Sequence, residues 1–348
     1  MSKNTAHRFV YKPEEVAGDY LFSQAGALGI KEYPHYVKAL RLTDAEVEGT
    51  TKEASLKPEK LTCLHAFTGN SQAIAFSPDG KTFASGRSFI KLWNLETGEI
   101  IRTFKVNSGI LKSVVFSPDR QTLISSGLSQ TIELWNIETG ELIRKLIPHS
   151  YAVNSLAISP DGQILASGDR GKSVQLWNLK TGQAISTLFG HSDWVNSVAI
   201  SPDGEIIASG SHDKTIKLLS SKTQEVISTF KGHLFPVYSV AFSPNGEIIA
   251  SGSAEGTIKL WNLNTGEVIK TLFGHSDEVN SVAFSPDGEI IASGSTDKNI
   301  KLWNVTTKEE ICTVNGHLSS VKSVVFSPDG KMLASGSSDG TIKIWQCG

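Results

Sequence analysis

Histidine, serine and aspartate recur in this chain in the combination that nucleophilic catalysis uses, where a base and an acid activate a hydroxyl group. The most complete sets are His275, Ser293 and Asp297, followed 42 residues later by His317, Ser335 and Asp339. A catalytic triad needs one asymmetric site, whereas these residues recur from repeat to repeat. We therefore interpret them as structural and expect neither a catalytic residue nor enzyme activity. The histidines are scattered rather than clustered, so we also expect no metal site.

The residues around these sets repeat at a fixed period. The tetrapeptide Ser-Pro-Asp-Gly, or a near copy, begins at Ser77, Ser117, Ser159, Ser201, Ser243, Ser285 and Ser327. Six tryptophans lie on a grid of 42 residues, namely Trp93, Trp135, Trp177, Trp261, Trp303 and Trp345. Leu219 occupies the one empty grid point. Seven repeats of about forty residues predict a closed or stacked array of one supersecondary unit.

One repeat is expected to form four short strands. Apolar, β-branched stretches cover residues 194–200, 205–210, 215–219 and 225–230, and turn residues such as Gly, Pro, Asp and Asn separate them. No segment keeps a helical period. A small sheet with two apolar faces needs a neighbouring sheet on each side. Radial stacking of seven four-stranded blades supplies those neighbours and leaves only short, protected edges.

These repeats resemble the WD-repeat β-propellers of the β-transducin type. The shared features are Gly-His before the first strand, Ser-Pro-Asp-Gly after it, Ala-Ser-Gly-Ser in the second strand and Thr-Ile-Lys-Leu-Trp-Asn in the third. Trp-Asn replaces the usual Trp-Asp, and the units are similar to those of the bacterial, especially cyanobacterial, branch of the family. The resemblance covers about residues 61–348 and implies an all-β, seven-bladed β-propeller of four-stranded antiparallel blades.

The resemblance also implies a hydrogen-bond network of Asp, His, Ser and Trp within each blade. Two units match it fully, with His275, Ser293, Asp297 and Trp303 in one and His317, Ser335, Asp339 and Trp345 in the other. Other units depart from it, with Glu255 or Gly171 at the position of Asp and Leu219 at the position of Trp. Such a network satisfies a buried imidazole and a buried indole N–H together.

The two ends of the repeat array are expected to meet. The last unit stops after its third strand, which contains Trp345, and residues 61–67 align with the fourth strands of the other units. We therefore expect residues 61–67 to complete the last blade, so that residues 61–348 form the propeller. Residues 1–60 carry no repeat motif and are expected to form an N-terminal arm, partly helical or irregular, with a linker. This arm is either loosely attached or a specific partner-binding or self-docking segment.

The composition excludes several classes of function. The formal charge is −2 and the basic residues are interspersed with acids, so we expect no nucleic acid partner. No run of eighteen apolar residues and no signal-like N-terminus is present, so we expect neither membrane insertion nor classical secretion. Cys63, Cys312 and Cys347 form neither a disulfide framework nor a metal-ligand pattern. A reducing, cytoplasmic location fits this usage.

Four aromatic residues are the candidates for partner binding: Tyr151, Trp194, Phe235 and Tyr238. They lie off the structural grid, in three consecutive units, at or just after the variable Gly-His connection. Variable loops on a rigid scaffold commonly carry binding, and clustered aromatics often anchor interfaces. The structural alternative is that Trp194 fills space left by Leu219 and that Phe235 packs under its own loop.

The sequence thus favours a non-catalytic scaffold or adaptor that needs no cofactor and binds protein or peptide partners on the variable face. Two alternatives remain open at this stage. The chain could be a regulatory or sensor module of a larger effector enzyme system, or a purely structural subunit of a complex.

Overall fold

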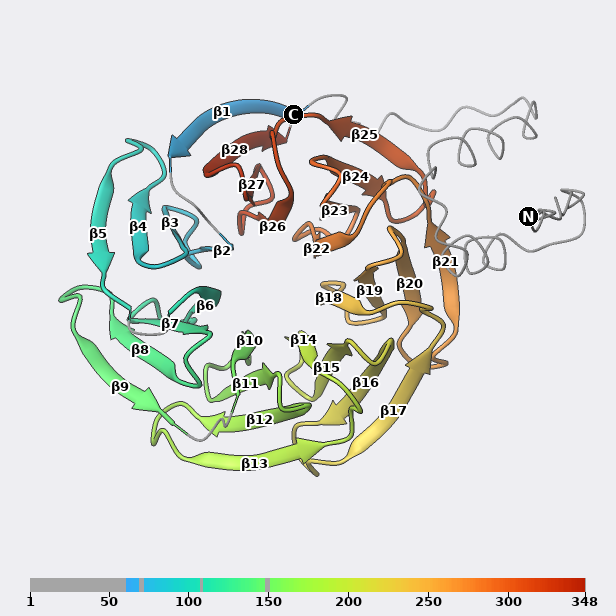
Figure 1. Ribbon diagram of the computed structural model, residues 1–348, viewed down its shortest axis with the longest axis horizontal. Helices are drawn as coiled ribbons and strands as arrows, with labels where there is room; N and C mark the ends of the chain where they lie inside the picture. The colour runs from blue at the N-terminus through green and yellow to red at the C-terminus, as the bar shows by residue number, and fades with distance from the viewer. Residues whose placement is uncertain (1–60, 69–71, 107–108, 148–150, 348) are drawn as a thin grey trace, which may run out of the picture. The chain divides into compact units, whose positions relative to one another are not determined.

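The described part of the chain consists of 28 β-strands and contains no helix. In the computed structural model, residues 61–68, 72–106, 109–147 and 151–347 are described. The chain divides into two units, Met1–Val47 and Glu48–Gly348, and all the described residues belong to the second. The arm expected over residues 1–60 lies outside the described residues. Seven four-stranded antiparallel sheets form a ring (Figure 1), which confirms the predicted seven-bladed fold.

The first strand of each blade lies nearest the central channel (Figure 1). These inner strands are β2 (Ala73–Phe76), β6 (Leu111–Phe116), β10 (Val153–Ile158), β14 (Val195–Ile200), β18 (Val237–Phe242), β22 (Val279–Phe284) and β26 (Val321–Phe326). In most of them the first and fourth residues are buried, as in β14, where Val195 and Val198 are covered.

The second strands are buried almost throughout because neighbouring blades cover both of their faces. They are β3 (Thr82–Gly86), β7 (Thr122–Gly127), β11 (Ile164–Asp169), β15 (Ile206–Ser211), β19 (Ile248–Ser253), β23 (Ile290–Ser295) and β27 (Met332–Ser337). Glycine in these strands permits close packing between blades. A Cβ atom placed on Gly168 would lie 2.6 Å from Cγ1 of Val195 in the next blade, so a larger residue there would push the blades apart.

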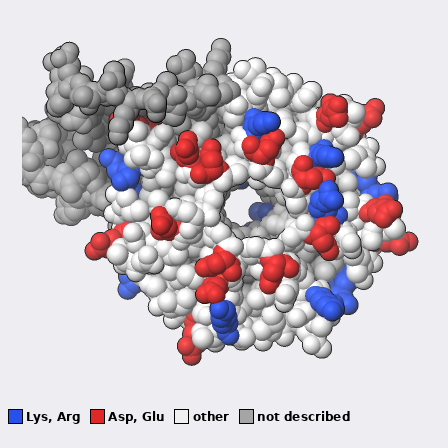
Figure 2. Space-filling view, turned by 180° about the vertical axis from the view of Figure 1, so that it is seen from behind, with Lys and Arg blue, Asp and Glu red and all other residues white. Residues whose placement is uncertain are grey.

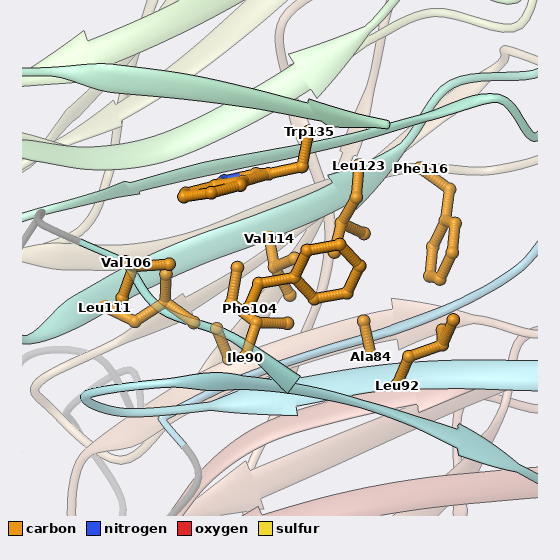
Figure 3. Packing of buried hydrophobic residues seen from close by; sticks show 11 residues of the cluster. Ala84, Ile90, Leu92, Phe104, Val106, Leu111, Val114, Phe116, Leu123 and Trp135 are labelled. Carbon is orange, nitrogen blue, oxygen red and sulfur yellow. The ribbon is translucent and has the colours of Figure 1, made fainter. Parts of the chain in front are cut away.

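The third strands carry the grid residues near their ends. They are β4 (Ile90–Asn94), β8 (Ile132–Asn136), β12 (Ser173–Asn178), β16 (Thr215–Ser220), β20 (Ile258–Asn262), β24 (Ile300–Asn304) and β28 (Thr341–Cys347). Seven buried clusters form the core, and each contains one grid residue: a tryptophan in six of them and Leu219 in the seventh. Figure 3 shows one cluster, in which Phe104 of the first blade packs with Leu123 and Trp135 of the second.

The outer strands are the most exposed and close the ring. They are β5 (Ile100–Phe104), β9 (Leu142–Leu146), β13 (Ala184–Phe189), β17 (Val226–Lys231), β21 (Val268–Leu272) and β25 (Glu310–Val314), with β1 (Leu61–Thr68) as the outer strand of the last blade. β1 pairs antiparallel with β28, with Leu61 opposite Cys347 and Thr68 opposite Thr341. The first described strand and the last strand of the chain therefore share one sheet.

The Ser-Pro-Asp-Gly turns between first and second strands share one geometry. In the turn after β14, the Ser201 hydroxyl donates to Asp203 Oδ1, the Glu205 N–H donates to the same oxygen at 3.0 Å, and Gly204 adopts a φ of 76°. Turns of this kind favour Asp and Gly for these reasons. Arg120 takes the glycine position in the second blade with a φ of 62°, and its guanidinium pairs with Asp79 of the first blade at 2.6 Å.

Candidate functional site

The Asp-His-Ser-Trp set of the last blade forms a continuous hydrogen-bonded chain. His317 Nδ1 lies 3.0 Å from Asp339 Oδ2, and its Nε2 lies 2.8 Å from Ser335 Oγ. The Trp345 indole N–H donates to the same Ser335 oxygen at 2.8 Å. Because that oxygen accepts from the indole, its own proton is available for His317 Nε2, while Nδ1–H donates to the carboxylate.

Burial and hydrogen bonding set the charge states in this network. Burial lowers the pKa of His317, although Asp339 acts in the opposite direction, so the imidazole is neutral at physiological pH. Burial alone would raise the pKa of Asp339, but hydrogen bonds from Thr341, from the Leu318 N–H and from His317 outweigh it and lower the pKa to about 2. The carboxylate is therefore ionised over the whole physiological range.

The network has the connectivity of a catalytic triad without access for a substrate. Ser335 is fully buried, as is Ser293 in the preceding blade, so neither hydroxyl can meet a substrate carbonyl. His275 repeats the geometry with Asp297 and Ser293 at 2.7 and 2.8 Å. These contacts join the strands of each blade near the face of the ring that carries the variable Gly-His connections.

The other five blades keep only part of the network or vary it, and in the first two the indole N–H still donates to the serine, from Trp93 to Ser85 and from Trp135 to Ser125. In the blade of β18, Glu255 replaces Asp, and its Oε1 lies 2.5 Å from His233 Nδ1. In the blade of β14, His191 contacts Asp213 and Ser209, but Leu219 replaces the tryptophan that would donate to the serine. In the blade of β10, Gly171 stands at the position of the acid, and His149 lies outside the described residues.

A strip of polar and aromatic side chains runs from the blade of β10 to the blade of β22. Trp194 is 41% exposed, so it is not sealed inside its blade. The Arg170 guanidinium lies over the Trp194 ring at 4.7 Å, which is a cation–π distance, and Arg170 Nε–H donates to Asn154. The centroid of the His212 ring lies 5.6 Å from that of Trp194 and 6.5 Å from that of Tyr238.

The strip continues from Tyr238 to an acidic residue of the next blade. The Tyr238 hydroxyl donates to Glu278 Oε1 at 3.2 Å. Burial and the negative charge of Glu278 raise the pKa of Tyr238 to about 12, so the phenol keeps its proton and remains a donor. Backbone hydrogen bonds hold the strip in place, because the His212 N–H donates to the Trp194 carbonyl at 2.8 Å.

Tyr151 and Phe235 extend this surface to different degrees. Tyr151 is 57% exposed and its ring packs on Gly171, where an added Cβ atom would lie 2.6 Å from Tyr151 Cδ2. The missing acid in this blade is therefore what leaves room for Tyr151. Phe235 is half-buried in the connection before β18, and the ring contacts found among the described residues do not include it.

The structure adds Arg170, His212 and Glu278 to the residues that the sequence singled out. Arg170 and His212 occupy equivalent positions after the second strand, where other blades have Ala254, Thr296 and Ser338. Glu278 directly precedes β22, which is the position that Trp194 has before β14 two blades earlier. Aligning the repeats position by position would have marked all three as deviations. Hereafter the recognition strip means Tyr151, Arg170, Trp194, His212, Tyr238 and Glu278.

No group of three or more His, Cys, Asp or Glu side chains is arranged to hold a metal ion within the described ranges. Over residues 61–347, apart from the three short gaps, there is also no helix that is long and apolar enough to span a membrane.

Comparison with known protein families gives a match over most of the chain. A family model described as the WDR3 second beta-propeller domain matches residues 70–348. This range contains the inner strands of all seven blades and every residue of the recognition strip.

Two curated relatives match shorter segments. The chain is 44% identical over 52 residues to human apoptotic protease-activating factor 1, which covers 15% of this chain and 4% of that protein. It is 37% identical over 70 residues to an uncharacterized WD repeat-containing protein, sll1491, of Synechocystis, covering 19% of this chain and 20% of that protein. The chain therefore spans a small part of each of these relatives.

Proposed function

This chain belongs to the WD-repeat propellers that the family model of the WDR3 second beta-propeller domain describes. We propose that it is a non-catalytic scaffold or adaptor that binds protein or peptide partners. Propellers of this family typically mediate protein interactions and are generally not enzymes. We place the docking surface at the recognition strip, together with Phe235. We further propose a cytoplasmic location, which the three free thiols support.

The observation that carries the proposal is the exposure and continuity of the strip. Large aromatics normally withdraw from water, yet Tyr151 and Trp194 are 57% and 41% exposed on one face. Rigid aromatic side chains give an interface much buried area at little cost in conformational entropy. Arg170 and Glu278 at its ends supply a cation and an anion that fix the orientation of a partner.

Quantitative capture tests this proposal. Immobilised wild-type protein and the Trp194→Ala variant would be incubated with lysate of the source cells, and bound partners quantified by mass spectrometry. Truncation at an interface anchor often costs about 2 kcal/mol, so capture should weaken at least about tenfold, equivalent to about 1.4 kcal/mol. Phe189→Ala is the matched control, because Phe189 is an exposed aromatic on the outer strand β13. Equal capture by wild type and Trp194→Ala would refute the assignment of the strip.

A second candidate is a regulatory or sensor module of a larger effector enzyme system. The similarity to a protein named apoptotic protease-activating factor 1 favours it, because that protein is by name an activator of a protease. Co-purification of a hydrolase that loses activity when the chain is removed would support this role over that of a general adaptor.

A further inference from the structure

The second residue of the inner strands β6, β10, β14, β18, β22 and β26, together with the equivalent residue just before β2, marks one level of the central channel. These residues are Gln72, Lys112, Asn154, Asn196, Tyr238, Asn280 and Lys322. The asparagines join neighbouring blades, since the Asn154 and Asn196 amides each donate to a backbone carbonyl of the next blade at 2.9 Å. Lys112 and Lys322 break this pattern with two positive charges, and they flank the first blade.

Arg87 adds a third cation between the two lysines. It lies in the turn between β3 and β4, and its carbonyl accepts a hydrogen bond from the Leu111 N–H at 2.6 Å, which places it beside the start of β6. Burial, followed by repulsion from Arg170, Lys322 and Arg87, lowers the pKa of Lys112. The cations are therefore close enough to repel one another.

The acidic residues nearby compensate only one of these charges. Glu278 and Asp277 act on Lys322, whose ammonium also donates to the Asn280 amide oxygen at 3.4 Å. Within the described residues, Lys112 makes no salt bridge. Figure 2 shows the channel open at the centre of the ring, with acidic side chains around the opening and a basic side chain inside it. A group of cations such as Arg87, Lys112 and Lys322 attracts an anionic ligand.

A hollow lies beside Arg87, where the first blade has a short turn, and Ile110 on its wall is two residues before Lys112. Gly86 pairs with Ile90 across the turn, whereas Gly210 pairs with Ile216 in the blade of β14, so two residues are missing. The hollow has a volume of about 400 Å³ and is lined by Arg87, Phe89, Lys91 and Ile110 together with small residues. Phe89 is 49% exposed there. The hollow is thus lined both by cationic side chains, Arg87 and Lys91, and by apolar ones, Phe89 and Ile110.

We propose that this hollow and the adjacent lysines bind an acidic peptide segment of a protein partner. A carboxylate would lie beside Arg87 and balance the positive charge of Arg87 and of the channel lysines Lys112 and Lys322, and a neighbouring apolar side chain would pack on Phe89 and Ile110. This inference rests on the proposed function in that the ligand is a protein on the variable face. The inference adds a second contact region, which lies on other blades than the recognition strip. It also specifies that the segment bound there is negatively charged.

Fluorescence anisotropy with defined peptides tests this site without the natural partner. The probe is a short fluorescein-labelled peptide that alternates Glu with Leu and Ser, and the reference peptide has Gln in place of every Glu. The full chain should bind the acidic peptide and not the reference. Lys112→Gln should weaken binding at least about tenfold, equivalent to about 1.4 kcal/mol. Because this variant removes a repelled, half-buried charge, its melting temperature should not fall.

Two further variants separate the possible outcomes. Lys331→Gln alters an exposed lysine beside a Ser-Pro-Asp-Gly turn and should leave peptide binding unchanged. Trp194→Ala should also leave it unchanged even where it abolishes capture of the partner, so failure of this proposal and failure of the proposed function are distinguishable. Equal binding of the two peptides, no binding of either, or no effect of Lys112→Gln would each overturn the proposal. Displacement by inorganic phosphate at lower concentration than by acetate would overturn the choice of a carboxylate ligand.

Discussion

Blades six and seven, which begin with β22 and β26, differ from blades three and four, which begin with β10 and β14, in how they use the same four strands. In blades six and seven the full Asp-His-Ser-Trp network is present, as in the set of His317, and it is buried. In blades three and four one member is replaced, by Gly171 or by Leu219, and exposed aromatics occupy the surface above. We propose that the full network serves stability and that the surface of blades three and four serves recognition.

The replacements matter because each changes one end of a blade: Gly171 leaves space for another side chain, and Leu219 removes the indole donor to Ser209. Gly171 has no side chain, and the Tyr151 ring packs where a Cβ atom would lie. Leu219 remains in the core at 3% exposure, so the exposed Trp194 does not take its place. In blades three and four, the loss of one network residue and the presence of an exposed aromatic residue thus occur together. This coincidence is open to tests that alter one region and leave the other intact.

Removing β1 should have the largest effect, because it damages the complete blade seven. A chain lacking residues up to Phe67 loses the strand that pairs with β28, together with the buried Leu61 and Phe67. Two buried apolar side chains alone correspond to about 3–6 kcal/mol, and the unpaired edge promotes aggregation. A chain lacking only residues 1–55 is the control and should keep the wild-type melting temperature. Similar thermal melts for the two truncations would show that the pairing is dispensable.

His317→Ala should give the next largest effect, on stability alone. It leaves Asp339 and Ser335 without their shared partner and should lower the free energy of unfolding by about 1–3 kcal/mol. The matched change His212→Ala removes a histidine from the recognition strip, orphans no buried group and should cost at most about 0.5 kcal/mol. Urea unfolding measures both variants. If His212→Ala proved as destabilising as His317→Ala, the division between the two regions would be wrong.

Much of the fold could be predicted from the sequence because its information is local and repeated. A motif that recurs seven times averages out ambiguity, so strands and turns follow from a single repeat such as residues 194–230. The outer position of β1 followed from the missing fourth strand after Trp345. The core followed as well, since every buried cluster contains one residue of the 42-residue grid.

The recognition strip was only partly predictable because its contacts join different blades. Trp194 and Tyr238 stood out as aromatics off the grid, but their contacts to Arg170 and His212 depend on side-chain directions across blades. Phe235 carried the same signal in sequence, yet the ring contacts of the strip do not include it. Exposure separates these cases, and a repeat pattern does not specify exposure for residues in connections.

A fall in pH should destabilise the protein through the complete Asp-His-Ser-Trp network of the last blade. The pKa of Asp339 is lowered from about 3.8 to about 2, so its contribution to stability is present above about pH 3.8 and is lost as the pH falls towards about 2. His317 has a lowered pKa too, so stability also declines as the pH falls below about 6.5. Asp339→Asn should therefore lose less stability than wild type between about pH 4 and about pH 2. Parallel pH profiles from calorimetry would contradict this assignment.

Gly171→Asp should give the smallest effect and would sharpen the comparison by restoring the acid in blade three. The new side chain would meet the Tyr151 ring and displace it, since an added Cβ atom lies 2.6 Å from that ring. Partner capture should weaken about threefold to tenfold, up to about 1.4 kcal/mol. In a Tyr151→Ala background the same substitution should have no further effect, which is the double-mutant control. An additive loss in that background would mean that Tyr151 is not the residue displaced.

Site-specific photocrosslinking tests the central claim most directly. A benzophenone side chain would replace Tyr151 on the recognition strip or Glu205, which follows a Ser-Pro-Asp-Gly turn at the opposite end of an inner strand. The two positions are similarly exposed, at 57% for Tyr151 and 54% for the Glu205 side chain. The account predicts that irradiation links a partner to position 151 and not to position 205. Crosslinks from position 205 alone, or equally from both, would contradict it.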